Sequence, residues 1–381
     1  MQHRSSQTAP HIYVALSGGV DSAVSAALLV KHGYRVTGAF IKTWQPAFLE
    51  CQAPLDREDA RRVAAHLGIP FTTIDLEDAY KHGVADQMID EYRVGRTPNP
   101  DILCNQQVKF GAFLREALAR GADGIATGHY ARVQRTASDG TYTLLRGADK
   151  NKDQSYFLWT LGQKQLSQTL FPVGEYTKPD VRALAKEFGL SVAAKKDSQG
   201  VCFLGKLDMK EFLGHFIDTV PGDVLNLHGD TIGRHDGALF YTLGQRHGFV
   251  VTKKSPTTGP LYVVAKDCVK NTITVSEQEE RTRADCTMTA HLTRTGWTRG
   301  NAVQGTFDVQ FRYRQPTRRA TIEPTKTGAV VTFTEPQLAV APGQSLVVYD
   351  KTVCLGGGII EQTSPSADTR PVLEVTATEV Y

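Results

Sequence analysis

A glycine-rich loop near the N-terminus carries the residue types that bind phosphate. Ser17-Gly18-Gly19-Val20-Asp21-Ser22 follows a short apolar run, Ile12 to Leu16, and a helix is predicted to start within it. Gly18 and Gly19 allow a tight turn and a close approach of the backbone to a ligand. The free N–H groups and the dipole of a helix N-terminus favour an anion, and two serine hydroxyls add donors. The loop has no lysine of the G-x-x-x-x-G-K-[ST] type, so it is not an ordinary P-loop. The alternative is a plain glycine turn before a helix.

The sequence around Cys104 suggests a reactive thiol. Cys104 follows a stiff, extended stretch, Thr97-Pro98-Asn99-Pro100-Asp101, because each proline biases its predecessor away from the helical region. Asp101 is predicted to cap a helix that runs to about Ala119, which places Cys104 in the first turn. Free N–H groups there lower the pKa of a thiol, although the nearby carboxylate opposes them. The alternative is a small, buried apolar cysteine.

Cys202 is the second candidate. It lies in Asp197-Ser198-Gln199-Gly200-Val201-Cys202-Phe203, a polar loop after Lys195 and Lys196, whose ammonium groups favour thiolate. The chain has six cysteines and no C-x-x-C pair, which argues against a disulfide framework and against a zinc site. Cys268, Cys286 and Cys354 lie in predicted strands and are interpreted as structural, and Cys51 lies in a polar loop with no assigned role.

A basic segment lies towards the C-terminus. Between Arg281 and Lys326 there are nine Lys or Arg residues and three Asp or Glu residues, interleaved with Trp297, Phe311 and Tyr313. Positive charge with aromatic residues is typical of an RNA-binding surface. The alternative is a solvated face of a β-domain.

The first part of the chain alternates short apolar strands with helices, which predicts βαβ units and a parallel sheet. A helix over Val20 to Lys31 is predicted to end at Gly33, and Asp56 is predicted to cap the next helix. Strands are predicted at Ile12 to Leu16, Val36 to Ile41, Phe71 to Ile74 and Ile125 to Thr127.

From about residue 213 the pattern changes to short alternating runs separated by Gly, Pro and Asn, which is typical of β-structure. The predicted domains are residues 1–212, a central β-domain of residues 213–286 and a C-terminal β-barrel-like domain of residues 287–381. The tail from Ser364 on is rich in Ser, Thr and Pro and is expected to be poorly ordered.

Composition is that of an ordinary globular protein, with 381 residues, 41% hydrophobic and 22% charged residues and a net charge of +3. No apolar run approaches the length of a membrane helix. The polar start, Met1 to Pro10, has neither a secretory apolar region nor an arginine-rich leader, so we expect a cytoplasmic protein.

Several motifs occur in a distinctive order. After the glycine loop come T-P-N-P-D-I-L-C-N at Thr97 to Asn105, A-T-G-H-Y-A at Ala126 to Ala131, and D-S-Q-G-V-C-F around Cys202. The loop resembles that of the adenine nucleotide α-hydrolases, and the whole series, from about Ile12 to Ile360, resembles the bacterial tRNA-specific 2-thiouridylases. The other matching motifs are N-K-D-Q-S-Y at Asn151 to Tyr156, Y-T-L-G-Q-R-H-G at Tyr241 to Gly248, F-R-Y-R-Q at Phe311 to Gln315, A-P-G-Q-S at Ala341 to Ser345 and L-G-G-G-I-I at Leu355 to Ile360.

The resemblance implies a fold and a reaction. The fold is an α/β N-terminal domain with a parallel sheet of the adenine nucleotide α-hydrolase (Rossmann-like) type, followed by two small β-rich domains. The reaction is ATP-dependent adenylation of O2 of the wobble uridine, position 34 of tRNA, followed by its replacement with sulfur. By resemblance the ATP site comprises Ala15, Leu16, Ser17, Gly18, Gly19, Val20, Asp21, Ser22, Ile41 and Gly128.

The resemblance also implies roles in sulfur transfer. Cys202 would carry a persulfide, Cys104 would be the second catalytic cysteine, and Asp101 would act as general acid/base. ATP would enter with Mg²⁺, without a permanently bound metal or cluster. Partners would be the tRNAs for lysine, glutamate and glutamine and a sulfur-relay protein or cysteine desulfurase, with the free protein a monomer. Expected tRNA contacts are Asn99, Pro100, Asp101, His129, Lys152, Asp153, Gln154, Arg312, Tyr313 and Gln344.

Two features qualify this interpretation. Ile41 stands where relatives often have Met, and Gln45-Pro46-Ala47-Phe48 replaces the acidic residues common after Trp44, which leaves the local loop geometry open. Two alternatives are another ATP α-hydrolase, such as an amidotransferase-type synthetase or a tRNA lysidine synthase, and a non-catalytic RNA-binding protein. The first has no need for the two cysteines, and the intact loop argues against the second.

Overall fold

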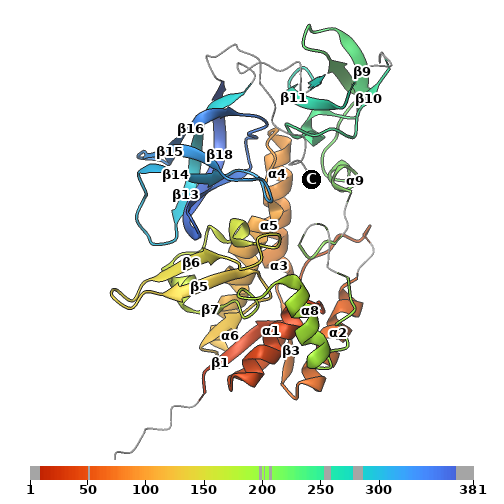
Figure 1. Cartoon of the computed structure of the whole chain (residues 1–381). Coiled ribbons are helices and arrows are strands. Elements are labelled where there is room, and N and C mark those ends of the chain that lie inside the picture. The colour runs from red at the N-terminus through yellow and green to blue at the C-terminus, as the bar shows by residue number, and fades with distance from the viewer. Residues whose placement is uncertain are drawn as a thin grey trace, which may run out of the picture.

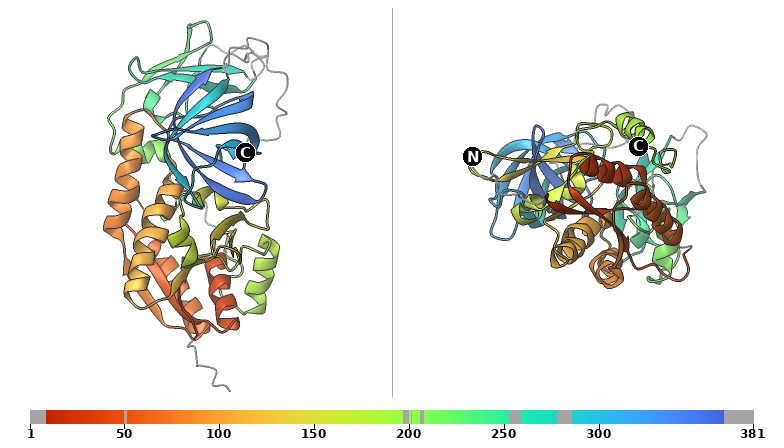
Figure 2. Two further views of the ribbon diagram at one scale, coloured as in Figure 1. Left: turned by 90° about the vertical axis from the view of Figure 1, so that its left-hand side faces the viewer. Right: turned by 90° about the horizontal axis from the view of Figure 1, so that it is seen from below.

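The computed structural model describes residues 9–49, 52–196, 200, 202–205, 208–252, 259–277 and 286–365. The molecule is elongated, with the α/β part at one end and the two β-rich parts at the other (Figures 1 and 2). Cys51, Asp197 to Gln199, Val201, the predicted break near residues 281–285 and the tail from residue 366 lie outside the described residues.

The N-terminal part is built on a parallel sheet with strand order β3-β2-β1-β4-β7. Its central strand β1 is buried on both faces, since Ile12 and Val14 contact one core while Tyr13 contacts the other. Its strands are β1 (His11–Ala15), β2 (Arg35–Lys42), β3 (Phe71–Asp75), β4 (Gly124–Ala126) and β7 (Thr169–Leu170).

Helices cover both faces of this sheet (Figure 1). The first core includes side chains of α1 (Val20–Lys31), α2 (Ala53–His66) and α8 (Lys178–Glu187). The second includes side chains of α3 (Glu77–Tyr80), η1 (Lys81–Ala85), α5 (Pro100–Leu103), η2 (Cys104–Phe113), α6 (Leu114–Ala119), η3 (Ser155–Leu158) and α7 (Gln163–Ser167).

The helix that follows the Thr97–Asp101 stretch changes its winding. It begins as α5, continues as the π-helix η2 and ends as α6. Gly111 suits this winding, because a Cβ there would lie 2.7 Å from the carbonyl oxygen of Gln106, five residues earlier. A second π-helix, η1, packs closely against η2 at Gly83. A Cβ on Gly83 would lie 3.0 Å from Cβ of Gln107. The π-helical segments therefore depend on two glycines.

Helix α4 (Asp86–Arg93) links the α/β part to the central β-rich part. Its Met88, Ile89 and Tyr92 pack with Phe212 and Leu213 of α9 (Met209–Gly214). The central sheet has the order β10-β9-β8-β12-β11. Its elements are β8 (Gly222–Leu225), β9 (Thr231–His235), η4 (Ala238–Phe240), β10 (Val250–Val251), β11 (Leu261–Asp267) and β12 (Thr272–Glu277).

The C-terminal part is a barrel, since β13 pairs with both β16 and β18 and so closes the order β13-β16-β15-β14-β17-β18. A hairpin from the N-terminal part extends the sheet through β6 and β5, where Cys354 pairs with Leu144. The strands are β5 (Ala131–Arg135), β6 (Tyr142–Arg146), β13 (Thr287–Trp297), β14 (Gly305–Gln310), β15 (Arg318–Pro324), β16 (Ala329–Gln337), β17 (Ser345–Asp350) and β18 (Val353–Pro365).

The predicted fold class is confirmed, with a parallel α/β sheet followed by two β-rich parts. Three local predictions are wrong. Helix α2 begins at Ala53, ahead of Asp56, and Asn99 rather than Asp101 caps α5 by accepting a hydrogen bond from the Ile102 N–H. Cys268 lies in the turn after β11 and is exposed. Within the described ranges, no helix is both long enough and apolar enough to cross a membrane.

Candidate active site

The phosphate loop lies between the end of β1 and the start of α1. Gly18 has φ +73°, and a Cβ there would lie 2.4 Å from the carbonyl oxygen of Asp56, so only glycine fits. Gly19 caps α1 without a side chain. The Ser22 hydroxyl accepts from the N–H of Ser17 at 3.2 Å and donates to the carbonyl of Gly19 at 3.0 Å, which holds the turn closed. The geometry is that of an anion site at a helix N-terminus.

A lysine reaches this loop from a distant helix. Lys178, the first residue of α8, donates from Nζ to both carboxylate oxygens of Asp21, at 2.8 and 2.9 Å. The Tyr130 hydroxyl donates to the same carboxylate at 2.8 Å. Asp149 accepts from the Lys178 N–H at 2.9 Å and so positions the start of α8. The loop therefore has a buried lysine that its own sequence lacks.

The two loops after β1 and β4 meet at the carboxyl edge of the sheet. A Cβ on Gly128 would lie 2.7 Å from the backbone nitrogen of Ser22, so glycine is required for this approach. After β1 the chain builds the sheet in one direction, through β2 and β3, and then returns to place β4 on the other side of β1. The direction in which strands are added therefore reverses at β1. Ligands of open parallel sheets bind at such a reversal. Ile41 lies near the end of β2 and is buried.

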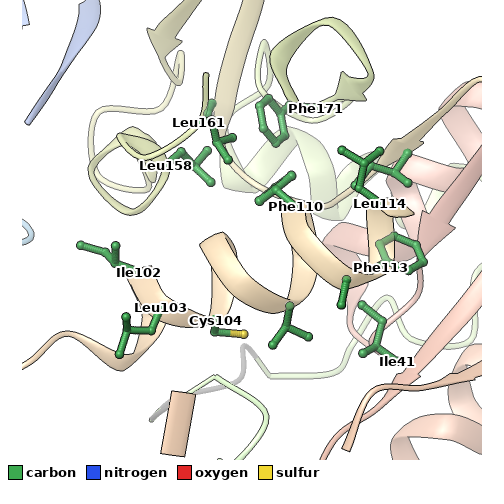
Figure 3. Close-up of a cluster of buried hydrophobic side chains, with 14 of the residues drawn as sticks. Ile41, Ile102, Leu103, Cys104, Phe110, Phe113, Leu114, Leu158, Leu161 and Phe171 are labelled. Carbon is green, nitrogen blue, oxygen red and sulfur yellow. The ribbon is translucent and has the colours of Figure 1, made fainter. Parts of the chain in front are cut away.

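The two predicted catalytic cysteines lie together. The Sγ atoms of Cys104 and Cys202 are 3.4 Å apart, with the Cys104 thiol donating. Cys104 is fully buried near the start of the α5–η2 helix, among the apolar side chains of Ile102, Leu103, Phe110 and Phe113 (Figure 3). Cys202 is half-buried on the opposing loop. Two sulfurs at this separation can form a disulfide after a small movement.

Three side chains hold the Cys202 loop over the helix. The Asp101 carboxylate accepts from the Cys202 N–H at 2.9 Å, and the Tyr80 hydroxyl donates to the Cys202 carbonyl at 2.8 Å. Gln45 donates from Nε2 to the Phe203 carbonyl at 3.0 Å. The segment after Trp44 that departs from the family pattern therefore supplies a contact to the cysteine loop.

The electrostatics distinguish the two thiols. The hydrogen bond from Cys104 and the Lys109 ammonium together lower the pKa of Cys202 to about 7, against the opposing effect of burial. Burial, followed by the contact with Cys202, raises the pKa of Cys104 well above its usual value. Burial also raises the pKa of Asp101. At neutral pH the site therefore favours a thiolate on Cys202 and a thiol on Cys104.

These values correct two expectations. Cys104 does not have the lowered pKa predicted for the first turn of a helix, because complete burial outweighs the N–H groups. Lys195 does not serve Cys202, because its Nζ lies 2.8 Å from Asp56 and 2.7 Å from Asp59. The ammonium group beside Cys202 belongs to Lys109, which sequence reasoning missed.

The predicted base-contacting residues lie at the start of the same helix. Asn99 and Pro100 are half-buried and occupy the cap and first position of α5. The barrel supports this stretch, since Gln344 donates from Nε2 to the carbonyl of Thr97 at 2.8 Å and to that of Pro98 at 3.2 Å. Asp101 thus contacts the cysteine loop directly, and Gln344 supports the stretch that leads into α5.

Other predicted tRNA contacts make internal bonds. His129 is 7% exposed, and its Nδ1 lies 2.7 Å from the Thr127 hydroxyl. Asp153 accepts from Arg146 Nη1 at 2.7 Å, and Gln154 accepts from the Tyr130 N–H at 2.9 Å. Lys152 directly precedes them, at the end of a turn.

Arg312 and Tyr313 lie where the barrel meets the other two parts. Arg312 donates from Nη2 to the carbonyl of Leu243 in the central part. The Tyr313 ring packs on Phe157 of η3, with centroids 4.4 Å apart. Arg299, from the same basic segment, donates to the Thr143 hydroxyl of β6 at 2.7 Å. Part of the basic segment therefore joins the barrel to its neighbours.

Of the other cysteines that the structure describes, Cys286 and Cys354 are buried and Cys268 is exposed. Among the residues that the structure describes, no group of three or more His, Cys, Asp or Glu side chains is arranged to hold a metal ion.

Comparison with known proteins identifies the family. The chain is 45% identical to the tRNA-specific 2-thiouridylase MnmA 2 of Geobacillus kaustophilus over 362 residues, which cover 93% of this chain and 96% of that protein. It is 46% identical to the tRNA-specific 2-thiouridylase MnmA of Shigella boydii over 369 residues, covering 94% and 99% of the two chains. The chain belongs to the tRNA-specific 2-thiouridylase family.

Family models divide this 2-thiouridylase-family chain into three. They are described as a tRNA methyl transferase HUP domain over residues 10–206, a tRNA methyl transferase PRC-barrel domain over residues 210–277 and an aminomethyltransferase β-barrel domain over residues 288–360. The descriptions of the first two family models name a methyl transferase, whereas the relatives are named as 2-thiouridylases. The adjacent sulfurs of Cys104 and Cys202 agree with the relatives' name. Among solved structures, the U34-tRNA thiolase NcsA of Methanococcus maripaludis is 16% identical, with a TM-score of 0.34, covering 54% of this chain and 63% of that one.

Proposed function

We propose that this chain catalyses the reaction for which its family is named, the 2-thiolation of the wobble uridine, position 34, of tRNA. The observation that carries the proposal is the 3.4 Å separation of the Cys104 and Cys202 sulfurs. Another ATP α-hydrolase that transfers nitrogen or ammonia needs no such pair. The substrates are ATP, entering as its Mg²⁺ complex, and the tRNAs for lysine, glutamate and glutamine.

ATP binds in the loop between β1 and α1 and at Ile41 and Gly128. O2 of the uracil attacks the α-phosphorus, the bond to pyrophosphate breaks, and AMP is left on the oxygen as a good leaving group. Support comes from the glycine geometry at Gly18, from the N-terminus of α1, which has no side-chain cap, and from the nearby ammonium group of Lys178. Backbone N–H groups and a positive charge suit a polyphosphate chain. The residues of the site are those at positions 15–22, 41 and 128.

Sulfur enters as a persulfide on Cys202, received from a sulfur-relay protein or a cysteine desulfurase. In one route the terminal sulfur attacks C2 of the base and AMP departs. The Cys104 thiolate then attacks Sγ of Cys202, which breaks the bond to the transferred sulfur and leaves 2-thiouridine and a Cys104–Cys202 disulfide. In the other route Cys104 attacks first and releases hydrosulfide, which then displaces AMP. Either way a dithiol reductant resets the disulfide, as in other thiol–disulfide exchanges.

Asp101 is the general acid/base of the proposal. Its carboxylate bonds the N–H of Cys202, and burial raises its pKa, so it can hold a proton close to the reacting atoms. Cys104, whose pKa is raised, must lose a proton before it attacks. A carboxyl group one helical turn away is suited to accept it.

The rest of the proposal concerns the tRNA and the division of the chain. Residues 1–212 carry the chemistry, residues 213–286 form the central domain, and residues 287–381 bind tRNA. The free protein is a monomer in the cytoplasm. Asn99, Pro100 and Asp101 contact the target base, which must leave the anticodon stack. The further tRNA contacts are His129, Lys152, Asp153, Gln154, Arg312, Tyr313 and Gln344.

A reconstituted reaction tests the proposal. It contains the full chain, Mg-ATP, an unmodified lysine tRNA, a cysteine desulfurase and radiolabelled cysteine, with nucleoside mass spectrometry and measurement of AMP and pyrophosphate. We expect oxygen to be replaced by sulfur at the wobble uridine, with AMP formed. AMP formation without sulfur incorporation, even with a relay protein added, would favour the amidotransferase-type alternative. tRNA binding without ATP turnover would favour the RNA-binding alternative.

A further inference from the structure

The site holds a half-buried cation, Lys109, that the sulfur-transfer scheme has not used. Lys109 lies in the π-helix η2, five residues after Cys104. Its Nζ is 5.6 Å from the centroid of the Phe203 ring, next to Cys202 in the opposing loop. Its ammonium group lowers the pKa of Cys202, as expected for a positive charge close to that sulfur. This lysine therefore joins the helix that carries one cysteine to the loop that carries the other.

The winding of the helix brings Lys109 to this position. In an α-helix, a residue five positions on lies about 140° around the axis, on a different face. In a π-helix, residues i and i+5 are linked by the backbone hydrogen bond and lie on successive turns of the same side. Gly111 permits the π-winding, because a Cβ there would meet the Gln106 carbonyl at 2.7 Å. The π-helical segment thus places an ammonium group on the cysteine face.

The groups that face Lys109 explain its charge. They are the sulfurs of Cys104 and Cys202, the Asp101 carboxyl and the imidazole of His129, and the Tyr80 hydroxyl bonds the Cys202 carbonyl nearby. Burial lowers the pKa of Lys109, but the cysteine site, above all the Cys202 sulfur, raises it by more, so the net shift is upward. The Lys109 ammonium opposes protonation of His129, whose pKa burial already lowers. An ammonium group partly removed from water is costly unless negative charge compensates it, and here the Cys202 sulfur supplies most of that charge.

We propose that Lys109 is a further catalytic residue, whose ammonium group contacts the Cys202 sulfur and neutralises the negative charge that this sulfur carries as thiolate and as persulfide. The inference rests on the proposed transfer of sulfur through Cys202. No bond forms or breaks at Lys109, and its proton stays on Nζ throughout. Together with the hydrogen bond from Cys104, the ammonium stabilises this anion beside Asp101.

The test measures alkylation of Cys202 in the full chain, so it needs neither tRNA nor a sulfur donor and remains valid if the proposed function fails. Modification by iodoacetamide is followed across pH by mass spectrometry of the Cys202 peptide. In Lys109→Met we expect the midpoint to rise by about one to three pH units, as when an opposite charge is removed from a titrating group. Lys109→Arg should keep the midpoint near that of the unmodified protein.

The matched control is Lys195→Met, which removes a lysine from the segment just before the cysteine loop, where it pairs with Asp56 and Asp59. We expect it to leave the Cys202 midpoint unchanged. A folded Lys109→Met protein with an unchanged midpoint overturns the proposal, as does an equal rise in Lys195→Met.

A second measurement needs no variant and covers the case in which Lys109→Met does not fold. The ratio of the rates with anionic iodoacetate and neutral iodoacetamide is compared between Cys202 and a short uncharged cysteine peptide. A local cation attracts the anionic reagent, so we expect a ratio several-fold higher at Cys202. A ratio equal to or below that of the peptide means that no net positive charge faces this sulfur, and the proposal is then wrong.

Discussion

The sulfur atoms of Cys104 and Cys202 lie 3.4 Å apart, although 98 positions separate the two residues in the chain. Cys104 comes from a buried helix and Cys202 from a loop that Asp101, Tyr80 and Gln45 hold in place. The resulting asymmetry, one thiolate and one thiol, matches the needs of sulfur transfer. A sulfur carrier must be ionised and reachable, while the thiol that resolves it must stay protected until its turn.

The first prediction concerns the two thiols. Cys104→Ser and Cys202→Ser are each expected to abolish 2-thiolation, because a hydroxyl can neither carry a persulfide nor form the disulfide. Affinity for tRNA should remain within about threefold, since it comes mainly from phosphate contacts. Nucleoside mass spectrometry and filter binding measure the two quantities. Cys268→Ser, which changes an exposed thiol outside the site, is the control. Near-normal thiolation in either catalytic variant would exclude the two-thiol mechanism.

The second prediction concerns the phosphate loop. Gly18→Ala should destabilise the fold by at least about 1–2 kcal/mol, the cost of a left-handed backbone for alanine, and should abolish AMP formation. The added Cβ would lie 2.4 Å from the Asp56 carbonyl, so the loop must move. Thermal unfolding and ATP binding by calorimetry measure the two effects.

Gly33→Ala is the matched control at the other end of α1. Gly33 has φ +81°, and a Cβ there would meet nothing within 4 Å. Alanine should therefore cost a similar backbone strain at Gly33 without altering ATP binding. Equal loss of ATP binding in the two variants would mean that the effect comes from stability and not from the loop.

The phosphate loop and its helix could be predicted because their determinants are local. Two glycines, two serines and the start of an apolar helix lie within six residues of one another. Lys178 could not be assigned to the loop, because 157 residues separate it from Asp21 and only the packing of α8 beside α1 brings them together. The one local signal was a lysine at the first position of a well-capped helix, where Thr177 and Asp180 form the cap.

The cysteine site shows the same limit in another form. The order of the motifs was enough to pair Cys104 with Cys202. The lowered pKa of Cys202 was also predicted correctly, but the lysine responsible for it and the direction of the shift at Cys104 were predicted wrongly. Lys195 is closer in sequence to Cys202, and Lys109 became its neighbour only through the π-winding of η2. A prediction that assumes α-helical periodicity turns Lys109 away from Cys104. Burial of Cys104, which depends on the whole core, also outweighed the local effect of a helix N-terminus.

A third prediction follows from Lys178. In Lys178→Met, the Asp21 carboxylate loses the lysine's ammonium group and keeps the hydrogen bond from the Tyr130 hydroxyl, so we expect a loss of about 1–3 kcal/mol in stability. The KM for ATP should rise at least about tenfold, the effect of losing roughly 1.4 kcal/mol of binding. Lys186→Met, in the exposed last turn of the same helix, should change neither quantity. An unchanged KM for ATP in Lys178→Met would show that this lysine only supports the fold.

The last prediction concerns the acid limb of stability. Burial first, and the Lys109 ammonium second, hold the pKa of His129 well below its ordinary value of 6.5. Below that pH the unfolded chain binds a proton at this residue that the folded chain does not bind. His129 therefore stabilises the fold fully above pH 6.5, and this contribution is lost as the pH falls from there towards the lower folded-state pKa. His129→Gln, which keeps a partner for the Thr127 hydroxyl, should make the pH dependence of the unfolding free energy shallower by up to about 1.4 kcal/mol per pH unit. Urea unfolding at a series of pH values measures this slope. His228→Gln, at an exposed position, is the control, and an equal change of slope in both variants would contradict the role of the buried imidazole.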